Sequence, residues 1–465
     1  MQQQGALRAA EHGPSLTFHM ARSRKVRLIA IVGVGLMLAA TLTGLLSIGH
    51  PGVLRLYGEG IAEKPCSAND VIVVPPGSSG TYVAKSSVLA ALSGGACAQS
   101  AIRADETWLQ SGVIPGSTVQ LRSMATRALL DLHLSVRPNG AVIAGWQPNW
   151  NHSWPRDSSW VAAALAYDGH GGDAYSILRF LERTQLHNGW WAARYSPRGA
   201  PVDDGRPDEL DADGWVPWAV WSWSAAMTAD GHDVSGELSL LWPMVKAAAN
   251  ATVHALTPDG LPVAAMDYWE HGEQVSLGTA APLLAGLRAA ADIARELGAA
   301  SSARSWSQAA ATLADGIQAG FGRYGYHHLA YDDSGSDAAV TFLGPPFEDQ
   351  SFAVDRAATR TMKSLALPNG GLLPGSAWSG NTTVAWTAET AFFALFSAET
   401  GDHQTASRIL SWLAAHRTRA GALPEMVNAS GVPVSVAPLA WTDAVVLLAL
   451  LAQSRPLPAI PGAGL

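Results

Sequence analysis

The sequence predicts an all-α protein in which six helical hairpins close into a double-layered ring. Three observations predict this fold class. Helical stretches rich in Ala, Leu and Trp alternate with short glycine turns, each followed by a brief apolar run. Hydrophobic residues make up 48% of the 465 residues, which is enough for a large core. Residues 161–166 and 445–451 are apolar around most of the helix circumference, so we expect such helices to be buried on more than one side.

The glycine turns recur six times along the chain. Their spacing averages about 56 residues, which leaves room in each unit for two helices of typical length and a loop. Such repeats indicate stacked helical hairpins, whose closure into a ring would bury the apolar helices. An open solenoid is the alternative, although its repeats would be shorter and more regular. The repeats fill a predicted domain over residues 117–454, followed by a loose Pro/Gly-rich tail over residues 455–465. The first glycines of the turns are Gly140, Gly189, Gly260, Gly325, Gly370 and Gly421.

The N-terminal part has the pattern of a membrane anchor. Residues 1–27 are polar and end in a basic cluster, and residues 28–48 form an uncharged run of 21 residues. A helix of that length spans the roughly 30 Å hydrocarbon core of a bilayer. The preceding cations place residues 1–27 in the cytoplasm and the remainder outside it. We therefore expect an uncleaved signal anchor at the cell membrane. A cleaved signal peptide, which would leave a secreted protein, is the alternative.

Residues 49–116 are expected to form an extracytoplasmic spacer or small cap. Residues 70–74 have the pattern of a short strand, and the chain's two cysteines, Cys66 and Cys97, lie in this part. Outside the cytoplasm the two thiols are free to form a disulfide, and two unpaired buried thiols are the alternative.

Composition excludes some classes of partner. The net charge of −8 provides no basic surface for nucleic acid. The chain has no C-x-x-C or H-E-x-x-H pattern, and we interpret the pair His327-His328 as structural or solvated, so no metal ion is predicted from these patterns. The 18 tryptophans could stack on apolar faces of sugars, although most tryptophans in proteins fill the core.

Two glutamates follow equivalent turns. Glu270 ends the run Asp267-Tyr268-Trp269-Glu270, in a loop between an apolar run and a long helical stretch over residues 280–297. Glu425 also comes shortly after a turn glycine. If the hairpins form a ring, these loops gather at one end, where catalytic groups concentrate. Hydrolysis of an acetal needs one carboxylic acid and one carboxylate, and the two glutamates fit these roles. The plainer alternative is a pair of ordinary solvated loop glutamates.

A third polar group lies in the run Trp154-Pro155-Arg156-Asp157. Proline at its second position suits the first turn of a helix. Arginine and aspartate side by side can form a planar hydrogen-bonding fork for sugar hydroxyls. The alternative for Arg156 and Asp157 is a structural salt bridge.

Residues 108–453 resemble glycoside hydrolase family 15, the glucoamylase-like enzymes. Five motifs in the family's order, at compatible spacings, carry this resemblance. They are Arg127-Ala128-Leu129-Leu130 with the turn at residues 139–144, the W-x-R-D run at residues 154–157, the loop at residues 209–215, the acid motif at residues 267–270, and Leu423-Pro424-Glu425 with Pro438-Leu439-Ala440-Trp441.

The resemblance implies an (α/α)6 barrel that releases glucose from non-reducing ends of α-glucosides with inversion of the anomeric carbon. It implies that Glu270 is the general acid and Glu425 the general base, with their carboxyl groups about 6.5–9.5 Å apart. The family pattern also implies the substrate-binding residues, which are Trp154, Arg156, Asp157, Asp267, Trp269 and Trp441. The implied partner is an oligosaccharide or polysaccharide, with no cofactor, beside the bilayer contacted by residues 28–48.

The sequence departs from the family pattern at two places. Residues 49–116 are too few for the β-sandwich that precedes the barrel in many bacterial members. The loop at residues 373–386 lacks the arginine of fungal members and carries Ser376, Trp378 and Asn381 instead. The alternatives are therefore a glycosidase for trehalose or another sugar, such as a uronate or mannose, and a non-catalytic glycan-binding or cell-envelope protein on the same scaffold.

Overall fold

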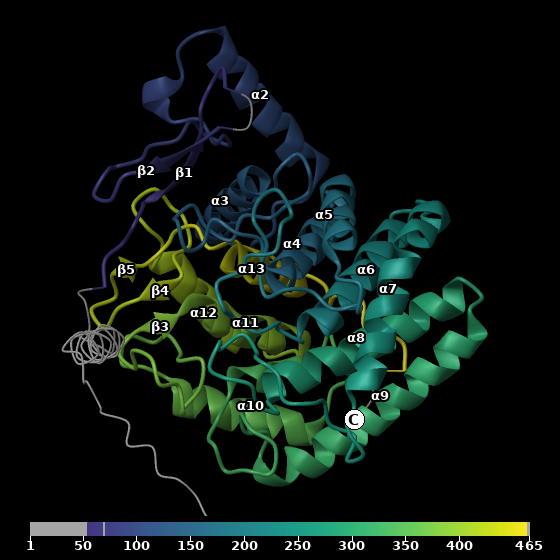
Figure 1. The fold of residues 1–465 in the computed structure, drawn as a ribbon. Coiled ribbons are helices and arrows are strands. Elements are labelled where there is room, and N and C mark those ends of the chain that lie inside the picture. The colour runs from purple at the N-terminus through teal and green to yellow at the C-terminus, as the bar shows by residue number, and fades with distance from the viewer. Residues whose placement is uncertain (1–53, 68–69, 463–465) are drawn as a thin grey trace, which may run out of the picture. The chain divides into compact units, whose positions relative to one another are not determined.

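The inner layer of the fold is a closed ring (Figure 1). The computed structural model describes residues 54–67 and 70–462. Six inner elements contact one another in sequence order, and the last also contacts the first. Nearly all of their side chains are buried, as expected for helices that are apolar on most sides. The inner elements are α4 (Pro155–Asp168), α6 (Ala212–Ala229), α8 (Leu277–Glu296), η3 (Ala338–Leu343), α11 (Thr387–Glu399) and α13 (Ala440–Ala452).

An outer helix precedes each inner element and packs around the ring. Most of these helices are less buried than the inner elements; in α10, for example, the buried residues lie along one face, as in an amphipathic helix. Outer and inner elements together form the six hairpins expected of an (α/α)6 barrel. The outer helices are α3 (Val119–Ser135), α5 (Gly171–Thr184), α7 (Ser235–Ala255), α9 (Ala300–Gly320), α10 (Phe352–Leu365) and α12 (His403–Ala415).

One hairpin differs from the prediction of two full helices in every unit. Its inner element, η3, is a 3-10 helix of six residues. Gly344, Pro345 and Pro346 follow at once and cannot continue a helix, because proline lacks the backbone N–H and clashes with the preceding turn.

The six glycine turns all lie between an outer helix and the following inner element. Their first glycines have φ between 81° and 94°, a conformation that favours glycine. At Gly140 a Cβ atom would also lie only 2.0 Å from the carbonyl oxygen of Ser176. Because each turn lies between an outer helix and the next inner element, the chain enters every inner element from the same end of the ring. Side chains near their N-termini therefore gather in one cup.

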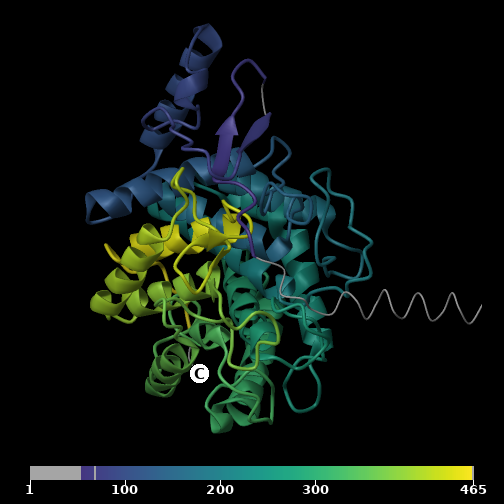
Figure 2. The same ribbon diagram turned by 90° about the vertical axis from the view of Figure 1, so that its left-hand side faces the viewer.

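The part predicted as a spacer is a cap that packs against α3 (Figures 1 and 2). A disulfide joins Cys66 to Cys97, as the sequence predicted. The carboxylate of Glu59 accepts hydrogen bonds from the backbone N–H groups of Gly77, at 2.8 Å, and Arg419, at 2.9 Å. These bonds fix this part of the chain, which was expected to be a spacer or small cap, to the last hairpin. The cap consists of the antiparallel strands β1 (Gly60–Glu63) and β2 (Val71–Val74), with η1 (Ala90–Leu92) and α2 (Ala96–Ser111).

A small antiparallel sheet borders the cup. It pairs β3 (Ala385–Trp386) with β4 (Met426–Val427), and β4 with β5 (Pro433–Val434). Glu425 directly precedes β4, so this sheet fixes the backbone of one predicted catalytic residue.

The end of the chain was expected to be loose, but two of its described residues are packed against the ring. Leu457 and Ile460 are buried, and the Leu457 N–H donates to the carboxylate of Glu399 at 2.9 Å. Two apolar side chains among the prolines are enough to hold this segment on the ring.

The predicted cytoplasmic residues 1–27 and the predicted membrane segment 28–48 lie outside the described residues. Among the residues that are described, none of the helices combines the length and apolarity needed to cross a bilayer.

Candidate active site

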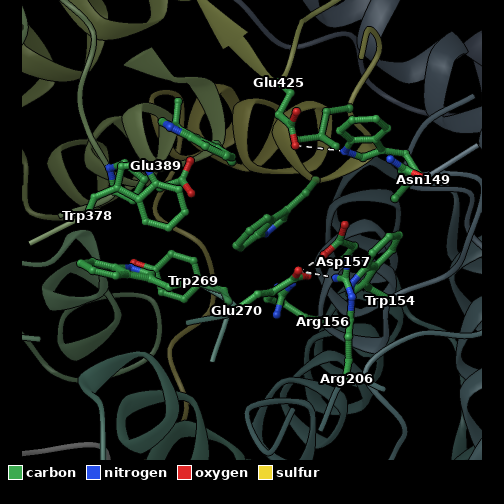
Figure 3. A pocket seen from close by; sticks show the side chains of 18 residues that line it. Asn149, Trp154, Arg156, Asp157, Arg206, Trp269, Glu270, Trp378, Glu389 and Glu425 are labelled. Atoms are coloured by element: carbon green, nitrogen blue, oxygen red, sulfur yellow. Dashed lines mark hydrogen bonds and ion pairs between the residues drawn. The ribbon is translucent and has the colours of Figure 1, made fainter. Parts of the chain in front are cut away.

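A cavity of about 280 Å³ opens in the cup, at the N-terminal ends of the inner helices (Figure 3). Both predicted catalytic glutamates lie on its wall, although they come from different hairpins. The structure brings all but one of the predicted site residues to this cavity, and the exception is Asp267. The predicted residues that line it are Trp154, Arg156, Asp157, Trp269, Glu270, Glu425 and Trp441.

Arg156 is the fixed cation of the cavity. It lies in the first turn of α4, where Pro155 occupies the predicted helix start. Its guanidinium donates to Glu209 and, at 3.2 Å, to Asp211. Burial alone would lower the pKa of Arg156, but the surrounding carboxylates raise it well above its usual value. The group is therefore always charged and held rigidly, 4.9 Å above the ring of Trp441.

Asp157 is buried beside this arginine, with one carboxylate oxygen 3.4 Å from the Nε atom of Arg156. Burial raises the pKa of Asp157 to about 6; Arg156 opposes the shift, and Asp211 and Glu270 add to it. The salt bridge that the sequence left as an alternative thus exists. Because Arg156 and Asp157 also face the cavity, the pair can still present donors and acceptors to a ligand.

Glu270 is the more open of the two glutamates. Its backbone has a φ of 53°, and its side chain is 32% exposed. The guanidinium of Arg206, which also contacts Asp204 at 3.3 Å, donates to one carboxylate oxygen of Glu270. The ring of Trp269, the residue before Glu270, stacks on the ring of His328 with ring centres 3.8 Å apart. As a general acid, Glu270 would therefore have to separate from Arg206.

Asp267 was expected to contact substrate, but it lies behind the cavity wall. Its Oδ1 atom accepts from the Trp269 N–H at 2.9 Å, and its Oδ2 atom lies 4.0 Å from Nδ1 of His328. That Nδ1 atom also contacts Asp337 at 2.6 Å. Burial raises the pKa of Asp267, and Asp337 raises the pKa of His328 against the effect of burial. In this geometry Asp267 binds the backbone of Trp269 and does not line the cavity.

The ligand atoms of Asp267, His328 and Asp337 lie within 4.8 Å of one another, a spacing that a cation could bridge. Asp337, however, already accepts hydrogen bonds from Tyr268 at 2.6 Å and from the Ala339 N–H at 2.8 Å. These hydrogen bonds make Asp337 part of a polar network that links Tyr268, His328 and the backbone of η3.

Glu425 is held by neutral donors. The indole N–H of Trp150 donates to Oε1 of Glu425 at 3.0 Å, and the hydroxyl of Ser435 donates to Oε2. Its backbone N–H donates to the Val436 carbonyl at 2.8 Å. Burial raises the pKa of Glu425; the hydrogen bonds from Ser435 and Trp150 oppose the shift, and Glu270 adds to it. A carboxylate with raised basicity and fixed orientation is suited to take a proton from water.

Sequence reasoning missed a third glutamate of the cavity, Glu389, in the first turn of α11. It is 4% exposed, lines the cavity, and its Oε2 atom has no hydrogen-bond partner among the described residues. Burial raises the pKa of Glu389 to about 8, with Glu425 adding to the shift and Arg156 opposing it. The sequence contained a hint of this residue. Glu389 follows Trp386 at the same spacing at which Asp157 follows Trp154, so a second acidic side chain could have been expected after a tryptophan at a helix start.

The aromatic wall is also larger than predicted. Trp378, noted only as part of a divergent loop, lies edge-on to Trp269 with ring centres 5.6 Å apart and to Trp386 at 5.2 Å. Sequence spacing could not show that this loop folds back onto the acid motif. Further cavity residues that were not predicted are Asn149, Trp150, Arg206 and Tyr268.

Comparison with known proteins agrees with this class of fold. No family model matches the chain. An uncharacterized glycosyl hydrolase of Methanocaldococcus jannaschii is 22% identical over 359 residues, which cover 71% of this chain. The chain spans only 55% of the length of that curated relative.

Solved structures are similar over most of the ring. A glycosidase in complex with glucose aligns with a TM-score of 0.62 at 18% identity, covering 72% of this chain and 97% of the glycosidase. A bacterial glucoamylase complexed with acarbose also aligns with a TM-score of 0.62, at 16% identity. The alignment covers 78% of this chain and 59% of the glucoamylase. The glucoamylase of Saccharomycopsis fibuligera aligns with a TM-score of 0.55 at 14% identity. The alignment covers 68% of this chain and 89% of that glucoamylase.

The fold is thus that of the six-hairpin glycosidases. The glucoamylases among these structures share the fold at 14% and 16% identity, and the relative found by sequence is described as a glycosyl hydrolase.

Proposed function

We propose that this chain is an inverting, exo-acting α-glucosidase of glucoamylase type. The observation that carries the proposal is that one cavity joins Glu270 and Glu425, from different hairpins, to the rigid Arg156–Asp157 pair. Two carboxyl groups are the minimum equipment for hydrolysis of a glycosidic bond. A binding protein needs neither of them.

In the proposed reaction Arg156 and Asp157 hold hydroxyls of the terminal sugar. Trp154, Trp269 and Trp441 enclose its apolar faces. Glu270, once separated from Arg206, gives a proton to the leaving oxygen. Glu425 takes a proton from a water molecule, and that water attacks the anomeric carbon from the opposite side. One proton enters the leaving group and one leaves the water, so the products are a free alcohol and inverted glucose.

The substrate is an oligosaccharide or polysaccharide with a non-reducing α-glucosyl end. The wall of Trp378 and Trp386 beside Trp269 supports this choice, since aromatic rings stack on the sugars that follow the terminal one. Trehalose is the second candidate, because the cavity is closed on several sides by these rings and a disaccharide would fill it.

The test is to incubate the full-length chain with maltose, isomaltose, trehalose and maltoheptaose and to follow the released sugar by NMR before mutarotation. β-Glucose as the first anomer is the expected result, and the preferred substrate identifies the linkage. Release of α-glucose would contradict the inverting mechanism. No release from any of the four sugars would contradict the proposed activity and favour a glycan-binding protein.

We also propose that residues 28–48 anchor the enzyme in the cell membrane with the ring outside the cytoplasm. The uncharged run and the basic residues before it support this topology, and the Cys66–Cys97 disulfide fits an oxidising compartment. Protease treatment of intact cells tests it: loss of the ring with retention of an N-terminal tag inside is expected. Recovery of the whole protein in the soluble cell fraction would contradict it.

A further inference from the structure

The general base is surrounded by contacts that begin in the cap. The hydroxyl of Ser435 and the indole N–H of Trp150 donate to the two carboxylate oxygens of Glu425. Neither donor is held by the ring alone. Each also contacts the short run Arg55–Leu56–Tyr57, at the start of the described chain.

The first contact fixes Ser435. The Tyr57 N–H donates to the Ser435 carbonyl at 2.9 Å, and the Ser435 N–H donates to the Arg55 carbonyl at 2.9 Å. Leu56 thereby forms a parallel β-bridge with Ser435. Ser435 has a φ of 69°, which is uncommon for a residue other than glycine and persists where surrounding contacts enforce it. The bridge is such a contact, and it aims the hydroxyl at Glu425.

The second contact fixes Trp150. The ring of Tyr57 packs against the ring of Trp150 with centres 5.7 Å apart. The Tyr57 carbonyl also accepts from the Gln147 side chain at 3.3 Å, and the Gln147 carbonyl accepts the Trp150 N–H at 2.9 Å. One residue of the cap thus supports both the ring of Trp150 and the turn that carries it.

From this geometry we propose that Arg55–Leu56–Tyr57 is a positioning segment for the catalytic base, acting through Ser435 and Trp150. The inference rests on the proposed function, in which Glu425 takes the proton from water. It gives the cap a role in catalysis that is separate from its role in stability. Glu59, directly after the segment, anchors it through Gly77 and Arg419 and so keeps the three residues in register.

In this proposal the segment influences the proton affinity of Glu425 through its two donors, Ser435 and Trp150. Hydrogen bonds donated to a carboxylate favour its charged form. The bonds from Ser435 and Trp150 therefore lower the pKa of Glu425 against the effect of burial. Three other charged groups act on Glu425 or on the neighbouring Glu389, and a change in the segment alters none of them. They are Glu270, Arg156 and Asp337.

The decisive variant is Tyr57→Ala in the full-length chain. It removes the ring against Trp150 and leaves the backbone bridge to Ser435. We expect kcat to fall about tenfold with little change in KM, because small misplacements of catalytic groups are costly. We also expect the acidic limb of kcat/KM to move to higher pH, because Glu425 loses a donor and binds its proton more tightly. Tyr57→Phe keeps the ring and is expected to restore the lost rate.

Two comparisons separate positioning from general damage. Tyr82→Phe removes the hydrogen bond from Tyr82 to the Ile61 carbonyl within the cap, away from the segment, so it should lower the melting temperature without moving the pH profile. In a double-mutant cycle, Tyr57→Ala should cost almost nothing further in a Trp150→Phe background, because the donor through which it acts is already gone. The proposal would be overturned if the losses of kcat in the two single variants added up in the double variant. It would also be overturned if the acidic limb of the kcat/KM profile of Tyr57→Ala stayed where it is in the wild type.

A crystal structure of Tyr57→Ala tests the positioning without any need for turnover. We expect the Trp150 indole nitrogen to move out of hydrogen-bonding range of Glu425. An unchanged contact near 3.0 Å would overturn the inference even if the enzyme is active. Conversely, a wild-type protein that hydrolyses no sugar would refute the proposed function, while the displaced indole would still show that the segment positions Trp150.

Discussion

The two sides of the cavity hold their glutamates by different physical means. Glu270 is 32% exposed and is bound by an arginine from an exposed loop. Glu425 accepts hydrogen bonds from two neutral groups, and the small sheet and the cap fix the segments that carry them. An exposed ion pair is weak and easily exchanged for water, whereas hydrogen bonds that are partly shielded from water hold one geometry more firmly.

The difference matches the two proposed tasks. The acid must approach leaving groups of different sizes, so a side chain at the open rim held by a replaceable partner suits it. The base must hold one small water molecule in line with the anomeric carbon, so a rigid site suits it. Both sides fall within one cavity because each glutamate precedes an inner helix at the same end of the ring.

The largest effects are expected from Glu270→Gln and Glu425→Gln. Each should lower kcat about 10²- to 10⁴-fold, because each removes a general acid or base while preserving side-chain shape. An α-glucoside with a good leaving group, such as 4-nitrophenol, needs no protonation. It should restore much of the rate in Glu270→Gln and little in Glu425→Gln. Equal restoration in both variants would contradict the assignment of roles.

A smaller effect is expected from Arg206→Ala. The variant should lower kcat/KM about threefold to tenfold, since Glu270 loses its positioning partner while the exposed pair itself is weak. Wild-type activity should fall slightly as salt rises from about 0.05 M to about 0.5 M, and the variant should not respond, because screening acts on exposed charges. Ser435→Gly, which removes a neutral donor at the base, is the matched control and should leave the salt response of the wild type intact.

The smallest effect is a pH-dependent stability change at Glu389, between the two sides. The folded protein keeps this carboxyl protonated up to a pKa of about 8, whereas the unfolded chain ionises near the ordinary value of 4.5. Wild-type stability should therefore fall as the pH rises through that interval. Glu389→Gln has no proton to lose, so its melting temperature should exceed that of the wild type by about 2 °C at pH 8 and by less at pH 5.

Calorimetry at the two pH values measures this difference. Glu273→Gln, at an exposed position of the acid loop, is the control and should show no comparable gain at pH 8. A melting temperature of Glu389→Gln that lies below the wild type at pH 8 would mean that Glu389 is ionised and paired in the folded state.

Much of the fold could be predicted because its signals are local. A glycine at positive φ, as at Gly140 or Gly421, and a helix that is apolar on most sides both appear directly in the sequence. The short η3 was missed because a proline pair overrides the pattern of the unit. The packed end of the chain was missed because two apolar residues, Leu457 and Ile460, do not stand out among prolines.

By itself, the sequence determined the six hairpins, the disulfide pair and the loops that carry Glu270 and Glu425, since turn chemistry, helical periodicity and cysteine count act over short stretches. Only the tertiary structure decided that Arg206 binds Glu270, that Asp267 lies behind the wall, and that Tyr57 supports the donors to Glu425. Those contacts join segments far apart in the chain. The physical reason is that closure of the ring, which depends on the packing of all six hairpins, sets which side chains can meet.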